Sequence, residues 1–162
     1  MSADGTLYFG SGRAGGKGAT DIWRSRLVGG KYGEPENLGD AINTAAVEIE
    51  PMIAPDESFL IFAAVGRPDG RGAYDLYVSY RRDGVWSKAV NLGEKINTGA
   101  REFSPRLSPD GRYLFFTSNR GFADRPLERR LSYQELMTRL RSPRNGLRDI
   151  YQMDLGALNL AR

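Results

Sequence analysis

The sequence of 162 residues contains no cysteine and no histidine. Without cysteine, disulfides and thiol chemistry are excluded, so nothing separates an oxidising from a reducing compartment. Without histidine, the Ser-His-Asp and Cys-His arrangements are excluded, and no metal site can use imidazole. A bound metal would have oxygen ligands, which favours calcium, magnesium or manganese over a conventional zinc site.

Long apolar runs and a strong excess of one charge are also missing. No run approaches the roughly 18 residues needed to cross a bilayer, so we expect no membrane span. No segment at Met1 resembles a secretory signal. The net charge of +3 is too small to predict nucleic-acid binding and is typical of a solvated, arginine-rich surface. With 40% apolar residues, the chain has enough apolar mass to form one packed domain over 1–162.

What the sequence does contain is an internal repeat with a period of 54 residues. NLGDAINT at 37–44 returns as NLGEKINT at 91–98, and Glu48 returns at the same spacing as Glu102. The tripeptides DIW, DLY and DIY also follow one another along the chain. A period near fifty with several short strands in each unit is typical of β-propeller blades, because one small sheet cannot bury both faces alone.

The repeat predicts an all-β chain of about three four-stranded antiparallel units, at about 1–45, 46–99 and 100–162. The first unit is expected to lack its opening strand and the last unit its closing strand. β-prone runs bounded by turn residues predict the strands. We expect them at 6–10, 21–27, 36–39, 47–54, 59–64, 74–80, 88–92, 102–107, 113–118 and 149–155.

The strand that opens the second unit shows polar and apolar alternation. Alternation places Ile49 and Ile53 on one face of this strand and Glu48, Glu50 and Met52 on the other. The next strand, FLIFAA, is continuously apolar. It is therefore expected to be covered on both faces.

A helical insertion is predicted at about 122–146, inside the last hairpin loop. Ser132 and Glu135 form a capping box, and Leu136, Met137 and Leu140 form an apolar stripe. The segment is basic through Arg125, Arg129, Arg130, Arg139, Arg141 and Arg144. Two interpretations stay open: a patch for nucleic acid or an anionic ligand, or a solvated helical lid packed on the propeller rim.

Several polar residues recur from unit to unit. Recurrence predicts a structural role, because a single active site does not need several copies. An arginine follows the second strand of each unit and an aspartate precedes the third, so we expect an Arg-Asp pair in every unit. These residues are Arg13, Arg67 and Arg120, with Asp21, Asp75 and Asp149. Asn43 and Asn97 are expected to cap turns.

Glu48, Glu50 and Glu102 are the candidate site residues. They lie at the start of the strand that is innermost in propellers, beside the central channel. Several carboxylates crowded there would raise one another's proton affinity or recruit calcium, magnesium or manganese. Glu48 and Glu102 are then the candidate catalytic carboxylates. The alternative is that these carboxylates bond backbone amides of adjacent units.

The segments SPDGRYLFFTSNR and DGVWSKAVNLGEKINT, together with the DIW, DLY and DIY strands, resemble the WD-repeat-like family that includes the TolB propeller. Similar domains are often fused to OmpA-type peptidoglycan-binding modules. The resemblance implies a six-bladed ring, a periplasmic or secreted location, and a module that binds a protein or small ligand. By analogy with six-bladed lactonases and phosphotriesterases, the alternative is a metal-dependent hydrolase.

About three units are too few for a six-bladed ring. Uncovered blade faces and unpaired strand edges favour association. We therefore expect a homo-oligomer, a dimer whose two chains close a six-bladed ring head to tail. The alternative is that the chain is a fragment of a longer propeller.

Overall fold

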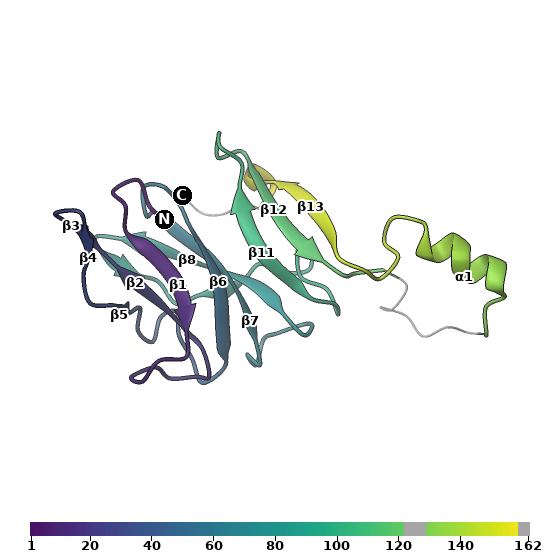
Figure 1. The fold of residues 1–162 in the computed structure, drawn as a ribbon, viewed down its shortest axis with the longest axis horizontal. Coiled ribbons are helices and arrows are strands. Elements are labelled where there is room, and N and C mark those ends of the chain that lie inside the picture. Colours follow the sequence, from purple (N-terminus) through teal and green to yellow (C-terminus); the bar gives the residue numbers. More distant parts are fainter. Residues whose placement is uncertain (122–128, 159–162) are drawn as a thin grey trace.

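The computed structural model describes residues 1–121 and 129–158. This part of the chain is mostly β, with antiparallel sheets that form an open half-barrel and one short α-helix (Figure 1). The sheets follow one another in chain order, as the repeat predicts.

The first sheet has the strand order β1-β2-β5. Its strands are β1 (Leu7–Ser11), β2 (Asp21–Ser25) and β5 (Glu36–Asn37), and a small hairpin of β3 (Leu27–Val28) and β4 (Lys31–Tyr32) lies between the last two. In the described residues β1 pairs with a strand along one edge only. In the part of the chain that the structure describes, the sheet therefore has no strand before β1, as expected from the sequence.

The second sheet has the order β10-β8-β7-β6, with β9 also paired to β8. Its strands are β6 (Val47–Ile53), β7 (Phe59–Val65), β8 (Asp75–Arg82), β9 (Val85–Trp86) and β10 (Val90–Asn91). The third sheet has the order β11-β12-β13. It contains β11 (Glu102–Leu107), β12 (Tyr113–Ser118) and β13 (Asp149–Asp154), followed by the 3-10 helix η2 (Leu155–Leu158).

Neighbouring sheets are joined by the same backbone contact at each junction. Thr20 forms a parallel bridge with Val47, and Tyr74 forms one with Arg101, which is 54 residues further along at both positions. Strands β1 and β2 contact β6, and β11 contacts β6, β7 and β8. The repeat in sequence is therefore also a repeat in the way that the sheets meet.

The middle sheet is buried on both faces, as its continuously apolar strand predicts. Side chains of β7 alternate between two core clusters: Leu60 and Phe62 belong to the first, and Ile61 and Ala63 belong to the second. The first cluster contains Tyr8 and Ile22 from the first sheet, and the second contains Leu114 and Phe116 from the third. Burial of apolar area at both faces is what makes the sheets stabilise one another.

The predicted alternation along β6 is wrong at one point. A β-bulge interrupts the pairing with β7 between Ile49 and Met52, and Glu50 has a φ of 53°. The extra residue reverses the phase of the strand. Ile49 therefore packs against the second cluster and Ile53 belongs to the first, so these two isoleucines do not share a face.

Helix α1 (Tyr133–Leu140) begins where the capping box predicts. The Ser132 hydroxyl accepts a hydrogen bond from the Glu135 amide, and the Glu135 carboxylate accepts one from the Ser132 amide. Hydrogen bonds from Arg129 and from Ser132 lower the pKa of Glu135 to about 2. The prediction of a lid packed on the sheets is wrong, because α1 has no buried residue and projects beyond the third sheet (Figure 1). The part of the insertion at 122–128 lies outside the described residues.

No helix in the described residues is both long enough and apolar enough to span a membrane.

Candidate functional site

The recurring asparagines bind the backbone of a neighbouring strand. The Asn43 side chain accepts a hydrogen bond from the Ile22 amide at 2.8 Å and donates one to the Ile22 carbonyl at 2.9 Å. Asn97 makes the same two bonds to Leu76, at 2.8 and 2.9 Å. Both asparagines are buried, so they supply the partners that a further strand would otherwise give. The prediction that they cap turns is wrong.

The recurring aspartates hold the hairpin loops through backbone amides. Asp21 accepts hydrogen bonds from the Lys17 amide at 2.8 Å and the Gly18 amide at 2.9 Å, and from the Asn37 side chain at 2.8 Å. This arrangement fixes the loop between β1 and β2 against β5. The aspartate thus acts as a short bridge between loop and outer strand.

The second and third units repeat part of this arrangement. Asp75 accepts from the Arg71 amide and from the Asn91 side chain, and Asp149 accepts from the Arg144 amide. Burial raises the pKa of Asp75. Its Oδ1 is buried without a hydrogen-bond partner in the described residues. The predicted Arg-Asp pairs are wrong, because the recurring arginines have other partners.

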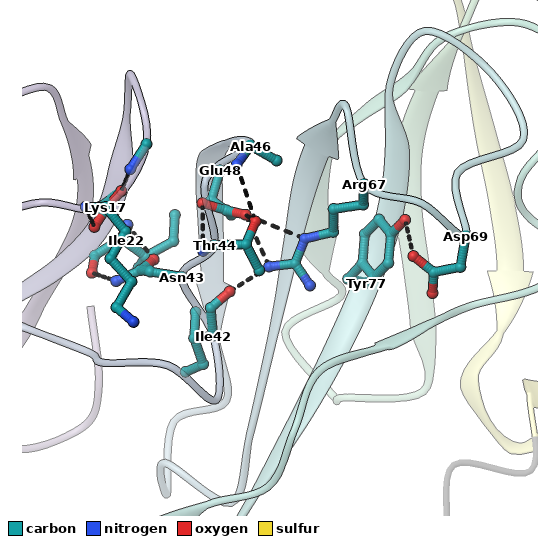
Figure 2. Close-up of polar contacts among 12 residues, drawn as sticks. Lys17, Ile22, Ile42, Asn43, Thr44, Ala46, Glu48, Arg67, Asp69 and Tyr77 are labelled. Atoms are coloured by element: carbon teal, nitrogen blue, oxygen red, sulfur yellow. Dashed lines mark hydrogen bonds and ion pairs between the residues drawn. The ribbon is translucent and has the colours of Figure 1, made fainter.

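Glu48 and Arg67 form a buried ion pair at the first junction (Figure 2). The Glu48 side chain is fully buried and that of Arg67 is 7% exposed. Arg67 donates to Glu48 from Nε at 3.1 Å and from Nη2 at 2.9 Å, and it also donates to the Ile42 carbonyl. Thr44 donates to the same carboxylate from its hydroxyl at 2.6 Å. The pair therefore binds the loop 37–44 to both β6 and the end of β7.

The second junction contains the same group of residues. Glu102 is fully buried and accepts from the Thr98 hydroxyl at 2.8 Å, from Arg120 Nη2 at 3.3 Å and from the Ser118 hydroxyl at 2.7 Å. Arg120 also donates to the Ile96 carbonyl. The two junctions share their residue types and most of their bonds, which indicates a structural role. We call each group a staple: Thr44-Glu48-Arg67 at the first junction and Thr98-Glu102-Arg120 at the second.

Each stapling arginine also lies over a pair of aromatic rings. The Arg67 guanidinium is 5.1 Å from the Phe62 ring centroid and 4.6 Å from that of Tyr77. Arg120 lies 5.3 Å from the Phe116 centroid and 4.6 Å from the Tyr151 centroid. Aromatic faces attract cations, so the rings hold the guanidinium in position for the carboxylate.

Glu50 connects the second and third sheets. Its carboxylate accepts hydrogen bonds from the Ser104 amide at 2.7 Å and the Ser104 hydroxyl at 3.0 Å. Ser104, like Glu50, has a φ of 53° and lies at a bulge. The interpretation that these carboxylates bond amides of an adjacent unit is thus correct for Glu50. It is also correct for Glu48 and Glu102, which accept from the Thr44 amide at 3.3 Å and from the Thr98 amide at 3.0 Å.

The described residues contain no group of three or more acidic side chains placed to hold a metal ion. Glu48, Glu50 and Glu102 each have a different set of partners. Their roles as metal ligands, and those of Glu48 and Glu102 as catalytic carboxylates, stay predictions about an assembled ring.

No family model and no curated protein sequence matches this chain. The resemblance to WD-repeat-like, TolB-like propellers therefore stays an expectation that depends on the motifs themselves. The function is proposed below from the geometry of the units.

Thr44 and Thr98 are the residues of this site that sequence reasoning missed. Each precedes its glutamate by four residues, in the pattern INT-x-x-x-E, at both copies of the repeat. The repeat of this spacing was the available signal. The spacing brings the threonine and glutamate side chains together only because the chain turns back between them. In this turn the Ala46 amide donates to Thr44 Oγ1 at 3.1 Å.

Proposed function

We propose that this chain is a propeller-type binding module. Its units act as about three blades, with the first and last incomplete, that present loops and a central channel to a protein or small-molecule ligand. The observation that supports this most is the repeated staple at both junctions, Thr44-Glu48-Arg67 and Thr98-Glu102-Arg120. A staple that repeats with the units is what a stacked repeat scaffold requires.

The binding rim in this proposal is the end where β1, β7 and β12 finish. The hairpin loops 12–20 and 66–74 leave from it, and the third loop carries α1 away from the sheets (Figure 1). Large apolar side chains are exposed in and after this helix: Tyr133, Leu136, Leu140, Leu147 and Ile150. Exposed apolar residues with basic neighbours favour a protein partner whose surface is apolar and acidic.

A double substitution tests the rim. Leu136→Ser with Leu140→Ser removes two exposed apolar side chains from α1 without touching a buried residue. We expect binding of a protein partner to weaken about tenfold or more, because buried apolar anchors dominate interfaces. The partner is captured from the source organism, purified and titrated against each variant by calorimetry.

The matched control is Val28→Ser with Val85→Ser, which alters two exposed valines of the small hairpins β3-β4 and β8-β9. This variant should bind within about twofold of the unaltered chain. A purified partner that binds both double variants equally well would contradict the proposal that it binds at this rim through α1.

The ring is proposed to close by head-to-tail association of two chains. β13 is the outermost strand of the third sheet and has one edge without a strand in the described residues. Such edges are templates for pairing with another chain. Light scattering of the full chain at micromolar concentration is expected to give twice the monomer mass of 18.0 kDa. A strictly monomeric mass would reject the dimer.

The metal-dependent hydrolase stays a prediction. It requires a divalent cation, with calcium, magnesium or manganese the candidates, bound near Glu48 or Glu102 in an assembled channel. Within one chain both carboxylates are buried and paired with arginine, so the binding module has the stronger support.

A further inference from the structure

The first sheet contains a third copy of the arginine and its aromatic pair. The Arg13 guanidinium lies 4.9 Å from the centroid of the Phe9 ring and 5.3 Å from that of Trp23. Phe9 and Trp23 are cross-strand partners on β1 and β2, as Phe116 and Tyr151 are on β12 and β13. The platform that holds a stapling arginine is therefore complete in this unit.

Ser11 completes the likeness to the third unit. Arg13 Nε donates to Ser11 Oγ at 3.1 Å, and Arg120 Nε donates to Ser118 Oγ at the same distance. In the third unit Ser118 and Arg120 both donate to Glu102. In the first unit the same hydroxyl and guanidinium are in the same arrangement.

The first unit differs from the second and third in lacking a carboxylate beside its arginine among the described residues. Among the described residues, no aspartate or glutamate forms an ion pair with Arg13. Arg13 is exposed, whereas the side chains of Arg67 and Arg120 are only 7% and 17% exposed. The strand that carries the glutamate is also different: β7 pairs with β6 and β12 with β11, but β1 has no strand on that edge within residues 1–121 and 129–158.

We propose that the free edge of β1, together with Ser11 and Arg13, is a docking site for an extended acidic peptide strand. The occupant adds to the sheet through its backbone and places one glutamate against Arg13. Addition of a strand to a sheet edge is a general mode of peptide recognition, in which backbone bonds give affinity and side-chain contacts give specificity. The positive charge of Arg13 is the complement of that glutamate.

The two internal junctions define the chemistry of the occupant. At β6, Glu48 lies opposite Ala64, and at β11, Glu102 lies opposite Ser118. The corresponding position on β1 is Ser11, so the glutamate of the occupant belongs opposite Ser11. A threonine four residues before it would share the carboxylate, as Thr44 does with Glu48. The preferred segment is thus I-x-T-x-x-x-E, in which the chain turns back between the threonine and the glutamate, the strand begins near the glutamate, and the isoleucine carbonyl accepts from the arginine.

The test uses a peptide copied from the first junction of this protein. The capped peptide 41–54, AINTAAVEIEPMIA, is labelled and titrated with the full chain by fluorescence anisotropy. Tryptophan emission, to which Trp23 beside Arg13 contributes, is followed in a variant with Trp86→Phe. We expect saturable binding and a change in tryptophan emission. The peptide with Glu48→Gln should bind about tenfold more weakly, because a charge-assisted pair is replaced by neutral hydrogen bonds.

Two protein variants complete the experiment. Arg13→Ala should weaken binding of the unaltered peptide about tenfold. Arg112→Ala is the matched control, because Arg112 is also an exposed arginine over an aromatic ring, 5.3 Å from the centroid of Tyr113. This control should bind within about twofold of the unaltered chain.

Three results would overturn the docking site: no saturable binding of the peptide, equal binding to the Arg13→Ala variant, or equal binding of a scrambled peptide. A dimer that Arg13→Ala dissociates would also overturn it, since the edge would then belong to a second copy. Ser11 and Arg13 lie at the end of β1 that faces the rim, but the docking site does not depend on α1, because the α1 variants leave β1 unchanged. Failure of the docking site at β1 is therefore distinguishable from failure of the proposed partner surface at α1.

Discussion

Glu48→Ala is expected to lower the free energy of unfolding by about 3–5 kcal/mol. The substitution leaves the Arg67 guanidinium, which is 7% exposed, without its carboxylate, and a buried charge without a partner is costly. It also removes the acceptor of the Thr44 hydroxyl and amide. The loop 37–44 then loses its attachment to β6, so the contact between the first and second sheets weakens as a unit. Urea denaturation followed by tryptophan fluorescence measures the change.

The matched control for this prediction is Glu36→Ala. Glu36 pairs with Arg24 at 2.8 Å, but its side chain is 48% exposed. Solvent screens such a pair, so the expected cost is about 0–1 kcal/mol. If both variants lose the same stability, the buried staple does not hold the junction. Arg67→Ala should add little to Glu48→Ala in the double variant, because the two residues act through one interaction.

The repeat period predicted most of the fold because it reports strand positions directly. All ten expected strands are present in the described residues, within a few residues at their ends. The capping box at Ser132 gave the start of α1, since its two hydrogen bonds are local in sequence. Local patterns and periods were therefore sufficient for the elements.

Pairing across the sheet was not predictable in the same way. Arginine and aspartate both recur in every unit, which suggested that they pair. The register instead places Glu48 opposite Ala64, close to where Arg67 leaves β7. The aspartate is satisfied by nearby amides of its own hairpin loop. Which acid meets the arginine depends on a strand contact that no spacing in the sequence reveals.

The β-bulges also made the contacts of the candidate carboxylates unpredictable from the sequence. Strict alternation would put Glu48 and Glu50 on one face of β6. The positive φ of Glu50 instead directs its carboxylate to Ser104 of the next sheet, while Glu48 turns to Arg67. A pattern of period two cannot show an inserted residue. The carboxylates that the sequence grouped together are thus divided between two separate contacts.

Gly18→Ala is expected to lower the free energy of unfolding by about 3 kcal/mol, because the chain has no room for a side chain there. A Cβ at Gly18 would overlap the Ala46 carbonyl oxygen and would lie 2.9 Å from the Thr44 oxygen. Both are backbone atoms of the segment 44–48 that joins the threonine and the glutamate of the staple, so neither can move without opening the junction. For a chain of this size the loss corresponds to a fall in melting temperature of about 6–12 °C.

The same substitution at the second junction provides an internal check. A Cβ at Gly72 would overlap the Ala100 carbonyl oxygen and would lie 2.7 Å from that of Thr98, so Gly72→Ala should destabilise the protein by a similar amount. Gly99→Ala is the control, since nothing lies within 4 Å of a Cβ at that position, and its stability should change by about 0.5 kcal/mol or less. Melting temperatures measured by differential scanning calorimetry compare all three. If Gly18→Ala and Gly72→Ala have the same melting temperature as the control, the hairpin loops do not approach the segments 44–46 and 98–100 as closely as the structure shows. If only one of them falls, the two junctions are not equivalent, and the repeated staple no longer supports a scaffold built from like units.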